Sequence, residues 1–144
     1  LDMLYKVRYN YYINNWKRTT FIMKTLVTKK STSLLSGIKN MMAGAKENYD
    51  FWTAPRDGTP KSSYCLEQLA DWDSKTQVKM GRKYFKVIQD RSVFAFIVKE
   101  DDGKFKKGDI LKAAGYNAPA LNQPRGNVLD GNYYIAWTGP LYLN

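Results

Sequence analysis

The spacing of apolar residues changes along the chain from a helical period to a strand period, and this change limits the fold more than any other feature. Between residues 31 and 49, apolar side chains recur three and four positions apart, as on one face of an amphipathic helix. From Tyr84 onward, short runs of β-branched and aromatic residues alternate with turn residues. A helical first part and a β-rich second part predict an α+β fold.

The first part of the chain predicts two helices. Ser31, Thr32 and Ser33 offer N-cap oxygens to the longer one, which needs tertiary support because Gly37 and Gly44 each cost about 1 kcal/mol relative to alanine. Its apolar face comprises Leu34, Leu35, Ile38, Met41, Met42, Ala45 and Tyr49. After a turn-rich loop at 51–62, Ser62 or Ser63 caps a short helix. The apolar face of this helix comprises Cys65, Leu66, Leu69 and Trp72, with Cys65 interpreted as a small buried hydrophobe.

The second part predicts a small, mostly antiparallel sheet or an open barrel, packed against both helices. Strands are predicted at 84–88, 92–98, 107–112 and 132–137, with turns at 89–91, 100–103 and 130–131. The segment 115–127 is too rich in Gly, Pro and Asn for a regular element and is predicted to be a loop, ordered or disordered. The predicted core contains Trp72, Phe85, Val87, Phe94, Phe96, Val98, Ile110 and Ile135. Alternation places Phe94, Phe96 and Val98 on one face and Phe85 and Val87 on another.

The domain organisation is predicted from a shift in composition near residue 23. Residues 1–22 are unusually rich in Tyr, Asn and Lys, and the sequence from Met23 resembles a natural start, so we interpret 1–22 as an appendage. Alternation at Val7, Tyr9, Tyr11 and Ile13 also fits a half-buried strand. Residues 23–144 form a single predicted domain, helical over 31–73 and β over 82–143. With no apolar run of roughly 20 residues and no leader pattern, we expect a cytoplasmic protein that does not enter a membrane.

Missing residue types limit the chemistry. The 144 residues include no histidine and one cysteine, which removes imidazole-based catalysis, Cys-His nucleophile pairs and every metal site that needs imidazole or a thiolate cluster. Five candidate carboxylates, Asp71, Asp73, Asp90, Asp109 and Asp130, show no recognisable catalytic spacing. No P-loop, dinucleotide fingerprint or nucleophile elbow is present. The sequence therefore predicts a non-catalytic protein without cofactor or metal.

The C-terminal third carries motifs that recur in a known group of proteins. These are SVFAFI from Ser92, GDILKAAGYNAPA from Gly108, RGNV from Arg125 and WTGP from Trp137. In this order they resemble a group of uncharacterised small tailed-bacteriophage proteins, over a little more than a third of the chain. The resemblance implies a phage origin and a place in the host cell cytoplasm, but no reaction.

The net charge of +10 favours binding to a polyanion. The candidate nucleic-acid-binding residues are Lys75, Lys79, Arg82, Lys83, Lys86, Lys112, Tyr116 and Arg125. The alternative is a module that binds a host or phage protein through segment 115–127, with Tyr116, Trp137 and Tyr142 as anchors. Exposed aromatics ringed by lysines favour nucleic acid, whereas exposed aromatics in an apolar patch favour a protein. A charge run that merely covers a solvated face is the third interpretation.

Overall fold

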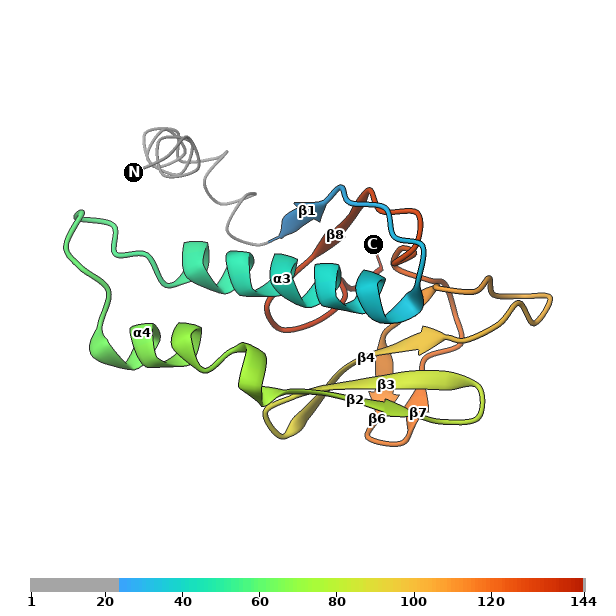
Figure 1. Cartoon of the computed structure of the whole chain (residues 1–144). Helices are drawn as coiled ribbons and strands as arrows, with labels where there is room; N and C mark the ends of the chain where they lie inside the picture. Colours follow the sequence, from blue (N-terminus) through green and yellow to red (C-terminus); the bar gives the residue numbers. More distant parts are fainter. Residues whose placement is uncertain (1–23, 144) are drawn as a thin grey trace.

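The computed structural model describes residues 24–143 and confirms the α+β fold (Figure 1). The predicted appendage at 1–22, with its alternative strand, lies outside these residues. The elements are β1 Thr25–Val27, α3 Leu34–Trp52, α4 Ser63–Ala70, the 3-10 helix η1 Asp73–Lys75, β2 Thr76–Met80, β3 Tyr84–Gln89, β4 Ser92–Val98, β5 Ile110–Leu111, β6 Ala113–Gly115, β7 Ala118–Pro119 and β8 Tyr133–Ile135. Helix α3 lies between the β1–β8 ribbon and the larger sheet, with α4 beside it.

Helix α3 confirms the predicted long helix but ends three residues later, at Trp52. Ser33 is the N-cap, because its Oγ accepts the Ser36 N–H at 3.2 Å. Leu35 was predicted on the apolar face and is 59% exposed instead. The buried stripe of α3 includes Gly37, Gly44 and Asn48. Its centre therefore lies on a different side of the helix from Leu35.

Close packing accounts for the two helix glycines. A Cβ on Gly44 would lie 2.5 Å from Val27 Cγ2, and a Cβ on Gly37 would lie 2.6 Å from the Val128 carbonyl oxygen. Only glycine lets the helix backbone approach β1 and the Val128 segment this closely. The loss in helix propensity is thus offset by burial of the β1–β8 ribbon against α3.

The predicted single sheet is wrong in its extent. The larger sheet has the antiparallel order β2-β3-β4-β5, so it begins before Tyr84, while β1–β8 and β6–β7 form separate two-stranded sheets and no barrel closes. The strand predicted at 107–112 is only Ile110–Leu111, and that predicted at 132–137 is Tyr133–Ile135, paired with β1. Segment 115–127, predicted to lack regular structure, contains the turn and second strand of the β6–β7 hairpin.

The hairpin predicted around residues 89–91 is confirmed, with Asp90 in the left-handed conformation at φ 59°. The prediction that Phe94, Phe96 and Val98 share one face of the sheet is wrong, because a β-bulge interrupts the alternation. Val87 pairs with Ala95 and Ile88 pairs with Val93, which leaves Phe94 as the extra residue. Phe94 therefore joins the main core, whereas Phe96 and Val98 lie in a second cluster on the other face.

Two apolar clusters fill the molecule. The main one joins α3, the helix-facing side of the sheet and the β1–β8 ribbon, and the smaller one joins Phe96, Val98, Phe105 and Leu111. All predicted core residues are buried except Phe85, which is partly buried against the main cluster. Cys65, predicted to be buried, is half-buried, and Leu66 is 52% exposed, because α4 packs only along the edge of α3.

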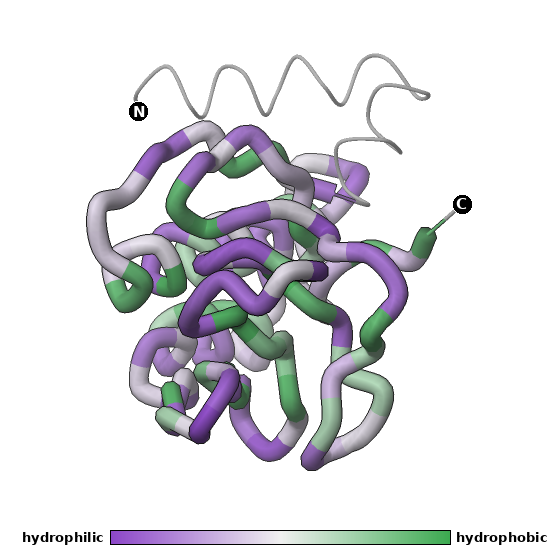
Figure 2. Tube along the Cα trace, turned by 90° about the vertical axis from the view of Figure 1, so that its right-hand side faces the viewer, coloured by the Kyte–Doolittle hydropathy of each residue, from purple (hydrophilic) through white to green (hydrophobic). Residues whose placement is uncertain are grey.

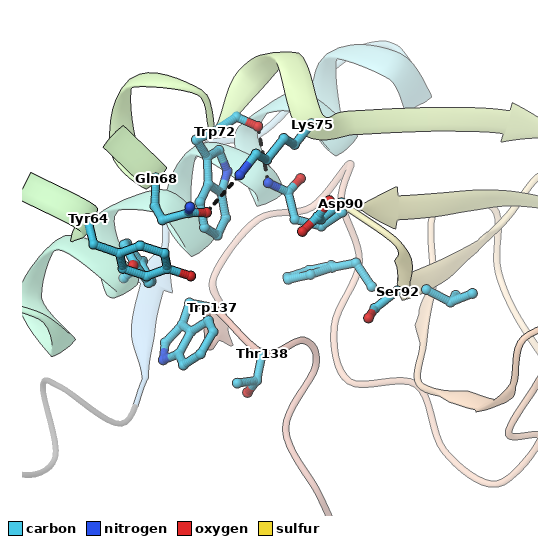
Figure 3. A pocket seen from close by; sticks show the side chains of 12 residues that line it. Tyr64, Gln68, Trp72, Lys75, Asp90, Ser92, Trp137 and Thr138 are labelled. Atoms are coloured by element: carbon cyan, nitrogen blue, oxygen red, sulfur yellow. Dashed lines mark hydrogen bonds between the residues drawn. The ribbon is translucent and has the colours of Figure 1, made fainter. Parts of the chain in front are cut away.

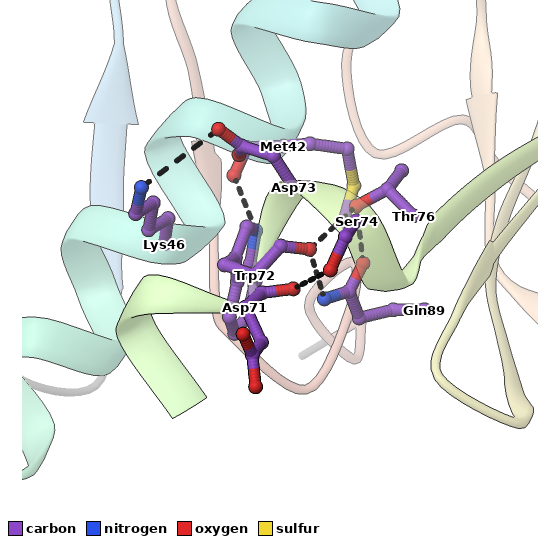
Figure 4. Close-up of polar contacts among 8 residues, drawn as sticks. All are labelled: Met42, Lys46, Asp71, Trp72, Asp73, Ser74, Thr76 and Gln89. Atoms are coloured by element: carbon purple, nitrogen blue, oxygen red, sulfur yellow. Dashed lines mark hydrogen bonds and ion pairs between the residues drawn. The ribbon is translucent and has the colours of Figure 1, made fainter. Parts of the chain in front are cut away.

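Trp72 fastens the helices to the sheet (Figure 4). Its indole Nε1 donates to the Met42 carbonyl oxygen at 3.2 Å, which joins it to α3. Its own carbonyl oxygen accepts Gln89 Nε2 at 3.1 Å and Thr76 Oγ1 at 3.3 Å. One buried residue thus connects α3 with the start of β2 and the end of β3.

Tyr133 offers a substitution that should stabilise the protein. Its hydroxyl is buried and has no hydrogen-bond partner in the described structure, and burial raises its pKa above the ordinary 10.0. We expect Tyr133→Phe to raise the free energy of unfolding by about 1–2 kcal/mol, since an unsatisfied buried hydroxyl is costly.

Urea denaturation at neutral pH measures this gain. Because the phenol of the folded state resists ionisation, wild-type stability should fall as pH rises above 10, and the variant should lose less. A destabilised Tyr133→Phe variant would contradict the assignment.

Candidate functional site

The β2–β3 hairpin, residues 76–89, carries cations without acidic neighbours. Its sequence contains Lys79, Arg82, Lys83 and Lys86, and no Asp or Glu occurs between Asp73 and Asp90. Lys79, Arg82 and Lys83 are exposed, and within residues 24–143 none of the four forms an ion pair. We call residues 76–89 the basic hairpin.

Register places two of these cations opposite each other. Lys79 on β2 is the cross-strand partner of Lys86 on β3, so both side chains lie on the same face. Like charges at directly opposed positions destabilise a sheet. This pairing therefore does not stabilise the fold. Residue choices that lower stability are typical of functional sites.

An exposed tyrosine completes this face. The β6–β7 turn reaches over β3, where Lys86 Nζ lies 3.5 Å from the centroid of the Tyr116 ring and donates to Asn117 Oδ1 at 3.2 Å. Tyr116 stays 53% exposed. The cation–π contact fixes the lysine beside an open aromatic surface. In Figure 1 the β6–β7 hairpin lies next to β3.

The hairpin turn is also held in place. Gly81 N–H donates to the Tyr84 carbonyl oxygen at 2.8 Å, and Lys99 Nζ donates to the Gly81 carbonyl oxygen at 3.0 Å. Arg82 and Lys83 therefore project from a closed turn. Figure 2 looks at the end of the molecule where this turn lies. Many residues of the chain on the side facing the reader are hydrophilic.

Two predicted cations serve the C-terminal segment instead. Lys112 Nζ donates to the Pro140 carbonyl oxygen at 2.8 Å and lies 4.0 Å from the Tyr142 ring centroid. Arg125 Nε donates to the Leu141 carbonyl oxygen at 3.1 Å. Burial, and secondarily the charge of Arg125, lowers the pKa of Lys112. We call Lys112, Arg125 and Tyr142 the C-terminal clasp, whose Tyr142 ring is 83% exposed.

The other predicted site residues lie elsewhere. Lys75 is on η1, where its Nζ donates to Gln68 Oε1 at 2.8 Å. Trp137 is half-buried, and its ring stands edge-on to the Tyr49 ring at 5.3 Å between centroids. Its backbone N–H donates to Asn48 Oδ1 at 2.9 Å. Trp137 is therefore largely a packing residue rather than an exposed anchor.

Three residues of the basic-hairpin region, Val78, Met80 and Asn117, were not predicted from the sequence. Alternation in Thr-Gln-Val-Lys-Met could have revealed β2, whose Val78 and Met80 are 38% and 71% exposed. No sequence signal indicated Asn117, since its contact with Lys86 depends on how the β6–β7 turn folds.

In the part of the chain that the structure describes, His, Cys, Asp and Glu side chains form no group of three that could hold a metal ion. No helix within residues 24–143 has the length and apolarity to span a bilayer. Comparison of the chain with protein-family models, curated proteins and solved structures finds no match.

The clasp makes a testable prediction. Arg125 donates to Leu141, to Asn122 Oδ1 at 2.7 Å and to the Gln123 carbonyl oxygen at 2.6 Å, so Arg125→Ala removes the bonds that hold two loops together. We expect faster hydrogen exchange in 139–143 and a loss of about 1–2 kcal/mol in unfolding free energy. Exposed Arg91→Ala is the control. Unchanged exchange in 139–143 would show that the clasp does not hold the segment.

Proposed function

We propose that the protein binds nucleic acid, without catalysis, through the basic hairpin and Tyr116. The observation that carries this proposal is the opposition of Lys79 and Lys86 beside an exposed tyrosine in an acid-free hairpin. Lysines around an exposed ring fit a phosphate backbone with an adjoining base better than an apolar partner.

The components have separate roles in this proposal. Lys79, Arg82 and Lys83 neutralise phosphates, so affinity falls steeply with salt. The open face of Tyr116 stacks on a base, which favours a single strand over a duplex with paired bases. Lys86 positions the ring and adds a nearby charge. We further propose a phage-type accessory protein that acts in the host cytoplasm.

Fluorescence anisotropy with a single-stranded oligonucleotide over a salt series tests the proposal. The triple variant Lys79→Gln, Arg82→Gln and Lys83→Gln should weaken binding at least tenfold and reduce the slope of log K against log salt by about 2. The matched control replaces the exposed Lys29, Lys30 and Lys39 with Gln, which changes the net charge equally. Equal weakening by both triples would contradict a local site.

Tyr116→Leu tests stacking separately from charge. It should weaken single-strand binding by about tenfold and leave the salt slope unchanged, because no phosphate contact is lost. Tyr116→Phe should retain affinity. A changed slope without loss of affinity would contradict the role assigned to the ring.

A second candidate function is binding of a host or phage protein at β2. This edge strand exposes Val78 and Met80, and within residues 24–143 one of its sides has no strand partner. A partner captured at high salt by wild type, but not by a Val78→Lys, Met80→Lys variant, would favour this function. Capture by both would place the contact elsewhere.

A further inference from the structure

A cavity of about 450 Å³ lies between the helical layer and the β3–β4 turn (Figure 3). It is separate from the cationic face, since none of Lys79, Arg82, Lys83 and Lys86 lines it. This volume falls in the range of small-molecule sites. Figure 3 shows Tyr64 and Trp137 on one side of the cavity and Asp90 and Ser92 on the other.

The aromatic side of the cavity is preorganised. Buried Trp72 is fixed by its bond to Met42, and Tyr49 packs against both Trp72 and Trp137, at 5.7 and 5.3 Å between ring centroids. Tyr64 is 65% exposed at the mouth. Tyr64 makes no ring stacking contact with the other described aromatics, so its face remains open to a planar ligand.

The cavity lining also carries one cation, Lys75, beside Trp72 and Gln68, and one anion, Asp90, on the other side (Figure 3). Gln68 holds Lys75 Nζ at 2.8 Å, which leaves further ammonium hydrogens for a ligand. Asp90 sits exposed at the hairpin turn, and its carboxylate forms no ion pair within residues 24–143. Both residues line the same cavity; the Asp90 N–H donates to the Lys75 carbonyl oxygen at 2.9 Å, but their side chains form no ion pair. Such separated charges suit a ligand that offers an anion at one point and hydrogen-bond donors at another.

We propose that this cavity binds a ribonucleotide unit. The base stacks on the open face of Tyr64, as bases stack on aromatic rings in single-strand sites, and Trp137 lines the wall beside it. Asp90 accepts hydrogen bonds from the ribose hydroxyls, a role carboxylates serve in dinucleotide sites. Lys75 binds the phosphate as a point charge. A purely apolar ligand would use neither charge, and an organic cation would meet Lys75 as well as Asp90.

The source of the unit is either a free nucleotide or the end of an RNA strand, since both present the same groups. The proposed nucleotide site does not use the cations of the basic hairpin. Its contacts come from Tyr64 on α4, Lys75 on η1, Asp90 in the β3–β4 turn and Trp137 after β8. Lys29→Gln, at an exposed lysine outside both sites, therefore serves as a control that should not change nucleotide binding, and Asp73→Asn is the control for loss of an exposed carboxylate.

Calorimetric titration of the full chain with adenosine 5′-monophosphate, its 2′-deoxy form and adenosine tests each contact. Wild type should bind the ribonucleotide about tenfold more tightly than either analogue, a ratio typical of one charged hydrogen bond. Asp90→Asn, which tolerates the left-handed backbone, should remove the preference over the deoxy form. Lys75→Gln should remove the preference over adenosine. Tyr64→Ala should weaken all three compounds about equally.

The outcomes distinguish the sources and the alternatives. A preference for a 5′-phosphorylated over an unphosphorylated RNA oligonucleotide, without binding of the free compounds, lost in Lys75→Gln and retained in Lys29→Gln, supports a strand end. Binding of the free compounds supports a nucleotide site. No binding of any of these, binding of a neutral sugar such as maltose with none of the nucleotides, or equal effects of Lys75→Gln and Lys29→Gln would overturn the proposal.

Discussion

Gly131→Ala should lower the free energy of unfolding by about 2–5 kcal/mol, the sum of a backbone strain and a steric clash. Gly131 has φ 70°, where an alanine costs about 1–2 kcal/mol. A Cβ there would also lie 2.6 Å from the carbonyl oxygens of Thr28 and Lys29. These two oxygens follow β1, so the clash would push apart the chain segments that flank the β1–β8 ribbon.

A matched glycine separates the two causes. Gly58 has φ 78°, but nothing lies within 4 Å of a Cβ at that position. Gly58→Ala should therefore show only the backbone strain, about 1–2 kcal/mol. Urea denaturation of both variants gives the difference, which we expect to be about 1–3 kcal/mol. Equal losses would mean that the close approach to Thr28 and Lys29 has no energetic effect.

Ile97→Ala should destabilise the protein by about 2–5 kcal/mol, because it opens a cavity in the main cluster. Ile97 is fully buried on β4 and is paired with Ile110 on β5. The control is Val78→Ala on the edge strand β2, where 38% of the residue is already exposed. It should cost less than about 1 kcal/mol.

Thermal and urea denaturation compare these two variants directly. If Val78→Ala cost as much as Ile97→Ala, the edge strand would be covered in solution. That result would also favour the protein-partner function over nucleic acid.

Local sequence patterns predicted the elements well and their partners poorly. The helix stripe and the β3–β4 hairpin follow from short-range periodicity, so both were predictable. The pairing of β8 with β1 joins residues more than a hundred positions apart, and no local pattern specifies it. The bulge at Phe94 was equally hidden, because the alternation 92–98 reads as uninterrupted.

For the candidate site, too, the residues were predictable from the sequence but their contacts were not. Its cations were all identified from composition, since an acid-free run needs no structure to be recognised. Which of them act together depends on register and on long-range contacts. Lys79 faces Lys86 through the β2–β3 pairing, and Tyr116 reaches Lys86 through a turn 30 residues later. The bonds of Lys112 and Arg125 to the C-terminal segment required the fold to be seen.

The most direct test of nucleic-acid binding is an NMR titration of the labelled full chain with a single-stranded oligonucleotide. The account predicts that the largest amide shifts occur in residues 79–86 and at Tyr116 and Asn117, and that they diminish as salt is added. Shifts concentrated on the exposed side of α3, or no shifts at low salt, would contradict the proposed function.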